Sequence, residues 1–290
     1  MKNTWKEKAV KLMLLSAAST SILIVIGIFV FLGKEGGTFV IKPGLKELLG
    51  SRWMPVSFQK ESFGILPLVT GSVLVTVLAT LLTIPFGISA SVYISELARP
   101  TEREILKPFI EILAGIPSVV IGFLGLILLV PLIKAGFRLS TGLTALAGAI
   151  LLALMAIPTV ISISEDAIRS VPVSYKQASL ALGASKMQTV WKVTVPAALP
   201  GIIAAIMLGM GRVIGETMAV MMVTGNAAIL TASPFESVRT MTATIAAEMG
   251  EVAFGSNHYR ALFCVGIVLL LATFGINIIA QKVLQKHRVR

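Results

Sequence analysis

An arginine and a glutamate lie four residues apart in an apolar stretch of this chain. They are Arg212 and Glu216, and the stretch extends from Ile202 to Val223. An ionisable side chain inside a membrane costs about 2.5 to 17 kcal/mol and is usually functional. A guanidinium can bind an oxyanion through several N–H groups, and a carboxylate one helical turn away can pair with it. The two residues therefore indicate an anion-binding group on a transport path, or an ion pair that only offsets its own burial.

The position of Arg212 in this stretch predicts its depth. It lies about ten residues, or roughly 15 Å of helix, from either end. If the stretch forms one continuous helix, Arg212 lies near the middle of the bilayer and Glu216 lies on the same face.

Three further residues are candidates for the same path. Pro117 removes a backbone N–H, and a half-helix that starts there would direct N–H groups at an anion, with the Ser118 hydroxyl beside them. The alternative is a proline kink that packs through nearby glycines. Thr76 could contribute a hydroxyl from the second apolar stretch, although hydroxyls in membrane helices commonly bond to their own helix.

The remaining composition excludes several kinds of site. The chain has two histidines, one cysteine and a single aspartate, and it contains no G-x-x-x-x-G-K-[ST] motif. A metal centre, a Ser-His-Asp triad and a P-loop are therefore not expected, and we predict no cofactor in this chain. An intramembrane enzyme would need more than the one deep acid–base pair.

The composition is that of a polytopic membrane protein. Of the 290 residues, 56% are hydrophobic and 13% are charged, against roughly 25% charged in soluble domains. The net charge of +11 comes from basic residues at the ends of apolar stretches, where snorkelling and topology explain it better than nucleic-acid binding. We expect an all-α protein with six transmembrane helices, at about 12–32, 66–94, 109–133, 143–163, 202–223 and 262–283.

The loops predict the orientation of a single transmembrane domain over residues 1–290. The termini and the loops on their side hold more Lys and Arg than the other loops, so both termini are expected in the cytoplasm. The first stretch is too long for a signal peptide, and we expect no cleavage. After this N-terminal span, the core covers about 66–283, with a cytoplasmic loop at 164–201 and long external loops at 33–65 and 224–261.

The cytoplasmic loop is predicted to form two short helices. Ser174 and Ser185 are each followed three residues later by glutamine, which is the spacing of a capping box. Gly183 lies between them at a helix end, and Pro196 and Pro200 are expected to stop the second helix. One apolar face of that helix, Met187, Val190, Trp191 and Thr194, would lie in lipid headgroups or dock in a groove of a partner.

The same loop resembles the EAA loop of ABC importer permeases. That family has E-A-A-x-x-x-G followed by an apolar residue and a proline, whereas this chain has Gln177–Ala178–Ser179, Gly183 and Pro196. In the family the loop is a coupling helix that inserts into a cleft on a separate ATPase. The resemblance implies that role for Ala178, Ser179, Gly183, Ala184, Ser185, Trp191 and Pro196.

The resemblance extends over nearly the whole chain to phosphate importer permeases. It rests on GILPLVTGSVLVTVLAT (64–80), IPFGISASVYISELA (84–98), AGIPSVVIGFLG (114–125), GRVIGETMAV (211–220) and RTMTATIAAEMGE (239–251). SRWMP (51–55) and GSNHYRALF (255–263) look more like the PstC type than the PstA type. The implied fold is the MetI-like type I importer permease fold.

This resemblance implies a function in the cell inner membrane. The chain would form half of a phosphate path, with a PstA-type second permease and about twelve helices in all. ATP and Mg would bind to an ATPase dimer in the cytoplasm, so this chain is not expected to be an enzyme. An extracytoplasmic phosphate-binding protein would dock on the external loops, and Glu216 would hold Arg212 until phosphate arrives.

Two alternatives of other kinds remain open from the residues. The permease could carry another oxyanion, such as sulfate or molybdate, or amino acids. A secondary transporter could couple to protons through Glu216, but then the loop at 174–195 would have no purpose.

Overall fold

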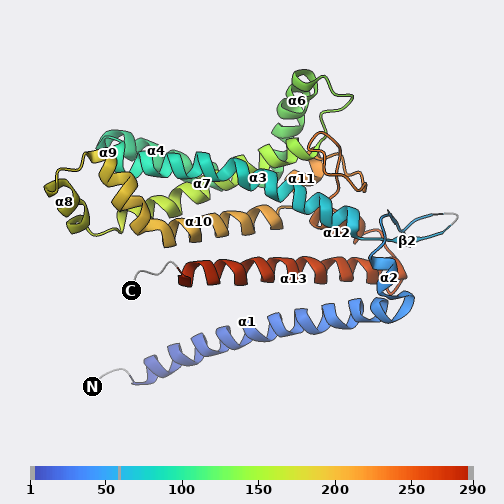
Figure 1. The fold of residues 1–290 in the computed structure, drawn as a ribbon. Coiled ribbons are helices and arrows are strands. Elements are labelled where there is room, and N and C mark those ends of the chain that lie inside the picture. Colours follow the sequence, from blue (N-terminus) through green and yellow to red (C-terminus); the bar gives the residue numbers. More distant parts are fainter. Residues whose placement is uncertain (1–3, 58–59, 287–290) are drawn as a thin grey trace.

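The computed structural model describes residues 4–57 and 60–286, and the chain is mainly helical over them (Figure 1). The longer helices are α1 (Thr4–Phe39), α3 (Leu66–Val92), α4 (Pro100–Gly115), α7 (Ala145–Arg169), α10 (Val195–Gly215) and α13 (Asn257–Lys286). The shorter ones are α2 (Leu45–Leu48), α5 (Ser118–Leu124), α6 (Val130–Phe137), α8 (Val173–Ala181), α9 (Lys186–Thr189), α11 (Met218–Val223) and α12 (Met241–Glu248). The π-helical segments η1 (Val40–Gly44), η3 (Gly125–Leu129) and η4 (Val190–Thr194) join consecutive helices, and η2 (Tyr93–Leu97) extends α3. Strand β1 (Trp53–Met54) pairs antiparallel with β2 (Ser62–Phe63).

Six helical segments in the described residues are long and apolar enough to cross a membrane, as predicted. Helix α7 is the most buried of them and lies between α3 and α10 (Figure 1). Glycines permit this close packing, because a Cβ at Gly87 or Gly209 would lie 2.9 or 2.6 Å from the side chain of Val160. Helices α3 and α10 thus contact α7 at the same residue.

Helices α1 and α13 pack against each other beside this core (Figure 1). Their contact is close at one end, where the Cys264 thiol lies 3.2 Å from the Gly36 carbonyl oxygen. There an aromatic cluster of Phe39, Trp53 and Phe63 packs on the start of α13. The other end of α1 lies away from the core and exposes its apolar side chains.

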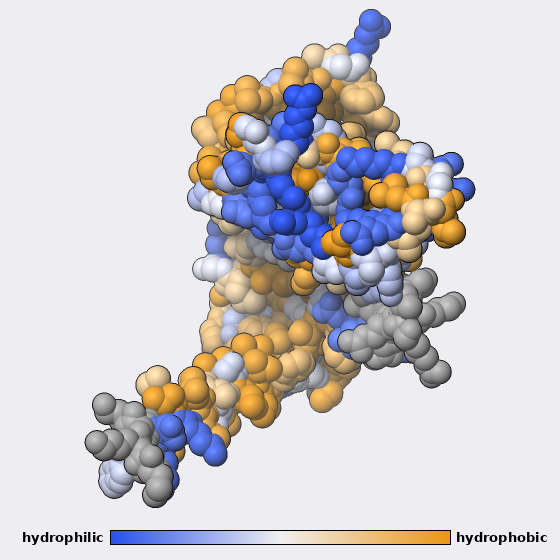
Figure 2. Space-filling model, turned by 90° about the vertical axis from the view of Figure 1, so that its left-hand side faces the viewer, coloured by the Kyte–Doolittle hydropathy of each residue, from blue (hydrophilic) through white to orange (hydrophobic). Residues whose placement is uncertain are grey.

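The two ends of the bundle differ. The first turn of α1, the last turn of α13 and the α8–α9 loop lie at one end, and the β1–β2 hairpin and α12 lie at the other (Figure 1). Figure 2 looks onto the α8 end and shows hydrophilic residues gathered there, with hydrophobic residues along the flanks. Polar ends and apolar flanks are the surface that a spanning protein requires.

The predicted third and fifth spans were wrong in their bounds. The third is interrupted at Ile116–Pro117, between α4 and the segment Ser118–Phe137. The fifth begins earlier and is helical without a stop from Lys186 to Gly215, so Pro196 and Pro200 do not end a helix. Val195 N–H donates to the Val190 carbonyl oxygen, five residues earlier, as in a π-helix. The ordinary α-helical hydrogen-bond pattern resumes at Pro196. Because proline has no N–H, this change of pattern leaves no donor unpaired there.

Candidate functional site

Two helix breaks lie side by side in the core. One separates α4 from α5 and the other separates α10 from α11. Helices α5 and α11 pack closely, since a Cβ at Gly122 would lie 2.9 Å from the Cα of Ala219. The breaks therefore bring backbone that is not helical to one place, which membrane proteins tolerate only beside protein or a polar path.

The sequence explains the first break. Ile116 precedes a proline and has φ −66° and ψ 129°, which is the extended conformation that a following proline favours. Because Pro117 has no N–H and α5 begins afresh at Ser118, the Ala114 carbonyl at the end of α4 has no backbone donor among the described residues. A helix starts directly after Pro117, as predicted, and the Ser118 side chain at its start is partly exposed. The close packing of Gly122 on Ala219 also agrees with the alternative, a proline kink that packs through glycines.

The second break follows Gly215. Glu216 has φ −69° and ψ 134°, and its carboxylate accepts a hydrogen bond from the Ala219 N–H at 3.2 Å. It thus caps the start of α11, where a negative charge is favourable. Its carbonyl oxygen accepts a hydrogen bond from the Thr242 hydroxyl at 2.9 Å, which fixes the break to α12.

Arg212 lies in the last turn of α10 and reaches the first break. Its Nη2 lies 3.4 Å from the Ala114 carbonyl oxygen and its Nη1 lies 3.4 Å from Thr159 Oγ1. Both contacts are long for hydrogen bonds to a guanidinium, and the side chain is exposed in the isolated chain. Most of its five N–H groups therefore stay available to an anion.

The predicted pair of Arg212 and Glu216 is wrong in this structure. Among the described residues no ion pair joins them. The spacing of four residues places side chains on one face only within a helix, and α10 ends at Gly215. The predicted continuous helix from Ile202 to Val223 is also wrong, because α10 ends at Gly215 and α11 begins at Met218. Thr159 nevertheless lies near the middle of α7, so Arg212 is at the middle of the bundle.

Thr76 lies half-buried on α3, and no described hydrogen bond joins it to Arg212 or Ser118. Its neighbours Thr80 and Thr83 donate to carbonyls of their own helix at 2.7 and 2.8 Å, as expected for such hydroxyls. In the described part of the chain the Thr76 hydroxyl makes no such bond.

The α8–α9 loop has the predicted helix–turn–helix form. Gly183 has φ +86°, and the Ser185 capping box is present, with Ser185 N–H to Gln188 Oε1 at 2.8 Å and Gln188 N–H to Ser185 Oγ at 3.2 Å. The prediction of a capping box at Ser174 is wrong, because α8 already starts at Val173, directly after Pro172. Pro172 precedes the first helical residue with an extended ψ of 133°, and no described side chain caps this helix start.

The exposed face of this loop is only partly the predicted one. Val190 and Thr194 are buried, whereas Met187 and Trp191 are exposed. Between the two helices lies an open depression of about 540 Å³, lined by Tyr175, Ala178, Ser179, Leu182, Ala184, Gln188, Lys192 and Val193. Of the residues predicted to couple to an ATPase, the depression is lined by Ala178, Ser179 and Ala184. Gly183 and Ser185 are their neighbours in the chain. Trp191 and Pro196 are exposed but do not line the depression.

One polar contact ties the loop to the bundle, and another joins its two helices. Lys176 Nζ lies 2.5 Å from Glu96 Oε1 in η2, and the hydroxyls of Ser179 in α8 and Thr189 in α9 lie 3.0 Å apart. A displacement of α8 would therefore be transmitted to η2 and to the start of α10.

The sequence did not indicate a charged network close to the same end. Glu165 of α7 is 1% exposed and contacts Arg103 Nη2 at 2.6 Å and Lys107 Nζ at 3.0 Å, both from α4. The carboxylate of Glu165 beside Lys107 raises the pKa of that amine above its usual range. No sequence signal could have paired them, since the partners lie 62 and 58 residues apart.

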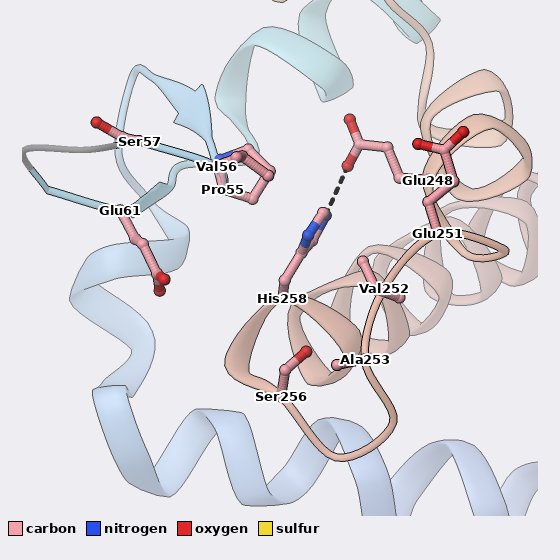
Figure 3. Close-up of a pocket in the computed structure, with 10 residues that line it drawn as sticks. All are labelled: Pro55, Val56, Ser57, Glu61, Glu248, Glu251, Val252, Ala253, Ser256 and His258. Carbon is pink, nitrogen blue, oxygen red and sulfur yellow. Dashed lines mark hydrogen bonds and ion pairs between the residues drawn. The ribbon is translucent and has the colours of Figure 1, made fainter.

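A second missed cluster lies at the opposite end (Figure 3). The carboxylate of Glu248 accepts hydrogen bonds from Trp53 Nε1 at 3.0 Å and Arg239 Nη1 at 2.6 Å and lies 2.8 Å from His258 Nε2. Glu248 borders a pocket of about 580 Å³ that is also lined by Glu61 and Glu251. Within the described residues no group of His, Cys, Asp and Glu has the arrangement of a metal site.

Comparisons with known proteins relate these features to transport. Residues 83–289 match the sequence model of the family described as "Binding-protein-dependent transport system inner membrane component". The chain is 42% identical over 252 residues to the "Probable ABC transporter permease protein YqgH" of Bacillus subtilis (strain 168), covering 86% of this chain and 81% of that protein. It is 33% identical over 266 residues to the "Phosphate transport system permease protein PstC" of Mesorhizobium japonicum, covering 85% and 80%.

Solved structures share the fold at low sequence identity. A bacterial ABC transporter involved in the import of alginate matches with a TM-score of 0.66 and 14% identity, covering 99% of this chain and 100% of that chain. The MetNI methionine ABC transporter in an inward-facing conformation matches with a TM-score of 0.58 and 19% identity, covering 77% and 97%. The predicted importer-permease fold is thereby confirmed.

Proposed function

The chain belongs to the family of binding-protein-dependent transport system inner membrane components, and from this premise we propose that it is a permease subunit of an ATP-driven phosphate importer. Several relatives that align with most of the chain are named phosphate transport system permease protein PstC. The same relatives favour the PstC type over the PstA type.

The observation that carries the proposal is the state of Arg212. Its guanidinium lies at the middle of the bundle, between two helix breaks, with two long contacts to neutral oxygens and no carboxylate partner among the described residues. A free guanidinium fork suits a phosphate oxyanion. Weak existing contacts suit a path, because the ion must bind and then leave. Ser118 and Thr76 would add hydroxyls to that path, and Pro117 holds the break open.

The exposure of Arg212 supports a shared path. A charged group at mid-depth is not stable against lipid, so its exposed side requires protein or water. A second permease of the PstA type, packed on this face, would enclose the path between the two chains.

The α8–α9 loop supports coupling to a separate ATPase. Its depression and exposed apolar side chains, including Leu182 and Trp191, offer a surface for a partner in the cytoplasm. ATP and Mg would bind to that ATPase dimer, so this chain itself would hold no cofactor and perform no hydrolysis.

The orientation follows from the same loop. If α8 faces the cytoplasm, both termini do so as well, because they lie at the same end of this multi-pass membrane protein (Figure 1). The hairpin, α12 and the pocket of Figure 3 then face outward, where a phosphate-binding protein would dock.

The test is phosphate uptake by the complex of both permeases, ATPase and binding protein in proteoliposomes. We expect Arg212→Gln to lower ATP-driven uptake by about tenfold or more, the effect of removing a charged hydrogen bond. Arg138→Gln at the exposed end of α6 serves as the matched control.

The same assay separates the alternatives. Sulfate or molybdate uptake without phosphate uptake would identify another oxyanion permease. Uptake driven by a proton gradient without ATP would identify a secondary transporter. Normal phosphate uptake by Arg212→Gln would show that this arginine is only structural.

A further inference from the structure

We infer that Thr159 of α7 is a second ligand of the transported oxyanion, acting beside Arg212. This inference rests on the proposed function. Thr159 is partly buried near the middle of α7, and its Oγ1 lies 3.4 Å from Nη1 of Arg212. Nothing in the apolar sequence around it marks it as a ligand.

In the described residues the hydroxyl of Thr159, like that of Thr76, does not bond to its own helix, unlike those of several other helical threonines. Thr80, Thr83 and Thr273 each donate to a carbonyl one turn earlier in their own helix, at 2.7, 2.8 and 3.0 Å. For Thr159 the corresponding residue is Met155, and among the described residues no such bond exists. Its oxygen instead accepts from Arg212, which leaves the hydroxyl proton free to donate.

The two groups form a suitable pair for one tetrahedral anion. Donor atoms 3.4 Å apart can contact one oxygen or two neighbouring oxygens of the same ion. Near neutral pH phosphate also carries a proton, which needs an acceptor. The Thr159 hydroxyl can donate and accept, whereas a guanidinium can only donate.

The neighbouring backbone adds a second acceptor. The Ala114 carbonyl lies 3.4 Å from Nη2 of Arg212 and has no backbone donor in the described part of the chain. An incoming phosphate would replace both long contacts of Arg212 with short charged ones. Arg212, Thr159 and Ala114 thus supply donors and acceptors from three helices.

The experiment compares hydroxyl and shape at residue 159 in the assembled importer. Thr159→Val keeps the branched shape without the hydroxyl, Thr159→Ser keeps the hydroxyl, and Thr273→Val removes a hydroxyl already bonded within α13. We expect Thr159→Val to lower phosphate uptake by about tenfold. ATPase activity stimulated by the loaded binding protein should stay within about twofold of wild type, and Thr159→Ser and Thr273→Val should transport like wild type.

Each outcome bears on one claim. If the wild-type complex takes up no phosphate, the proposed function fails. If the wild type transports and Thr159→Val does so equally, only the inference about Thr159 fails. Equal loss in Thr159→Val and Thr159→Ser would also overturn it, since shape rather than the hydroxyl would then matter. If Thr159→Val does not assemble, Thr159→Ala against Thr159→Ser repeats the comparison.

Discussion

At the scale of single residues, the charge of Arg212 has no carboxylate partner in the part of the chain that the structure describes. Arg103 and Arg239 each lie 2.6 Å from a carboxylate oxygen, whereas Arg212 contacts only a hydroxyl and a carbonyl. A guanidinium at mid-depth without a carboxylate must face water, polar protein groups or an anion. This is what a permease that binds an anion briefly would require.

Glu216 has a different role from the one its spacing predicts. Its carboxylate caps α11, and an amide oxygen could accept the same Ala219 N–H. We therefore expect Glu216→Gln to keep most of the thermal stability and Glu216→Ala to lose about 0.5–2 kcal/mol.

Thermal unfolding of the purified permease pair in detergent would measure this difference. Glu111→Ala, at an exposed position of α4, is the control for loss of a carboxylate. A similar loss in Glu216→Gln and Glu216→Ala would contradict the capping role and point to the charge itself.

At the scale of elements, the two breaks in the helices position Arg212 and the groups that it contacts. The break at Pro117 gives α4 a free carbonyl end, and the break after Gly215 allows Arg212 to reach it. At the α8 end, the contact of Lys176 with Glu96 and the helical continuity from α9 into α10 join the α8–α9 loop to two spans. A movement of this loop can therefore reach the break that holds Arg212.

The turn at Gly183 tests this link. Its φ of +86° strains any branched side chain, although the space that a Cβ would occupy is open, with no other atom within 4 Å. We expect Gly183→Val to lower phosphate uptake and uptake per ATP hydrolysed, because α8 would be misplaced against the ATPase.

Gly183→Asn is the matched control, since asparagine adopts this backbone conformation more readily. It should retain most of the coupling, measured as phosphate transported per ATP. Equal coupling in Gly183→Val and wild type would show that the turn geometry is not needed.

At the scale of the whole molecule, the two ends are held by separate charged clusters. Glu165 joins α4 to α7 near the α8 end, and Glu248 joins the hairpin, α12 and α13 at the other end (Figure 3). Between these two clusters, Thr242 of α12 donates a hydrogen bond to the Glu216 carbonyl oxygen at the break after Gly215. The hairpin end of the bundle is thus connected to the break after Gly215 by one short helix.

Removing Glu248 should loosen only the hairpin end of the bundle. Glu248→Ala leaves Trp53, Arg239 and His258 without their common acceptor, at a cost of about 1–3 kcal/mol. We expect faster hydrogen exchange in β1, β2 and α12, with exchange in α8 unchanged.

Glu251→Ala is the control, because the Glu251 carboxylate lines the same pocket, and the contact of Glu251 with Glu248 is a backbone hydrogen bond at 3.0 Å that the substitution leaves in place. Equal exchange in Glu248→Ala and wild type would show that the cluster does not hold the hairpin. Faster exchange throughout the bundle would show that its effect is global.

Features that depend on local chemistry could be predicted from the residues alone. Six spans follow from long apolar stretches, the turn at Gly183 follows from a glycine between two helices, and the Ser185 cap follows from a serine and a glutamine three residues apart. The half-helix near Pro117 follows from the missing N–H of proline. Each of these depends on residues within a few positions of one another.

The partners of the charged groups depend on how the helices pack, so they could not be predicted from the sequence. Arg212 and Glu216 look like a pair because they are close in sequence, yet Arg212 contacts residues 53 and 98 positions away. Likewise, nothing local pairs Glu165 with Arg103, or Glu248 with Trp53. Charges in an apolar interior bind whatever polar group the packing brings near, so their partners depend on how the helices approach and where they break.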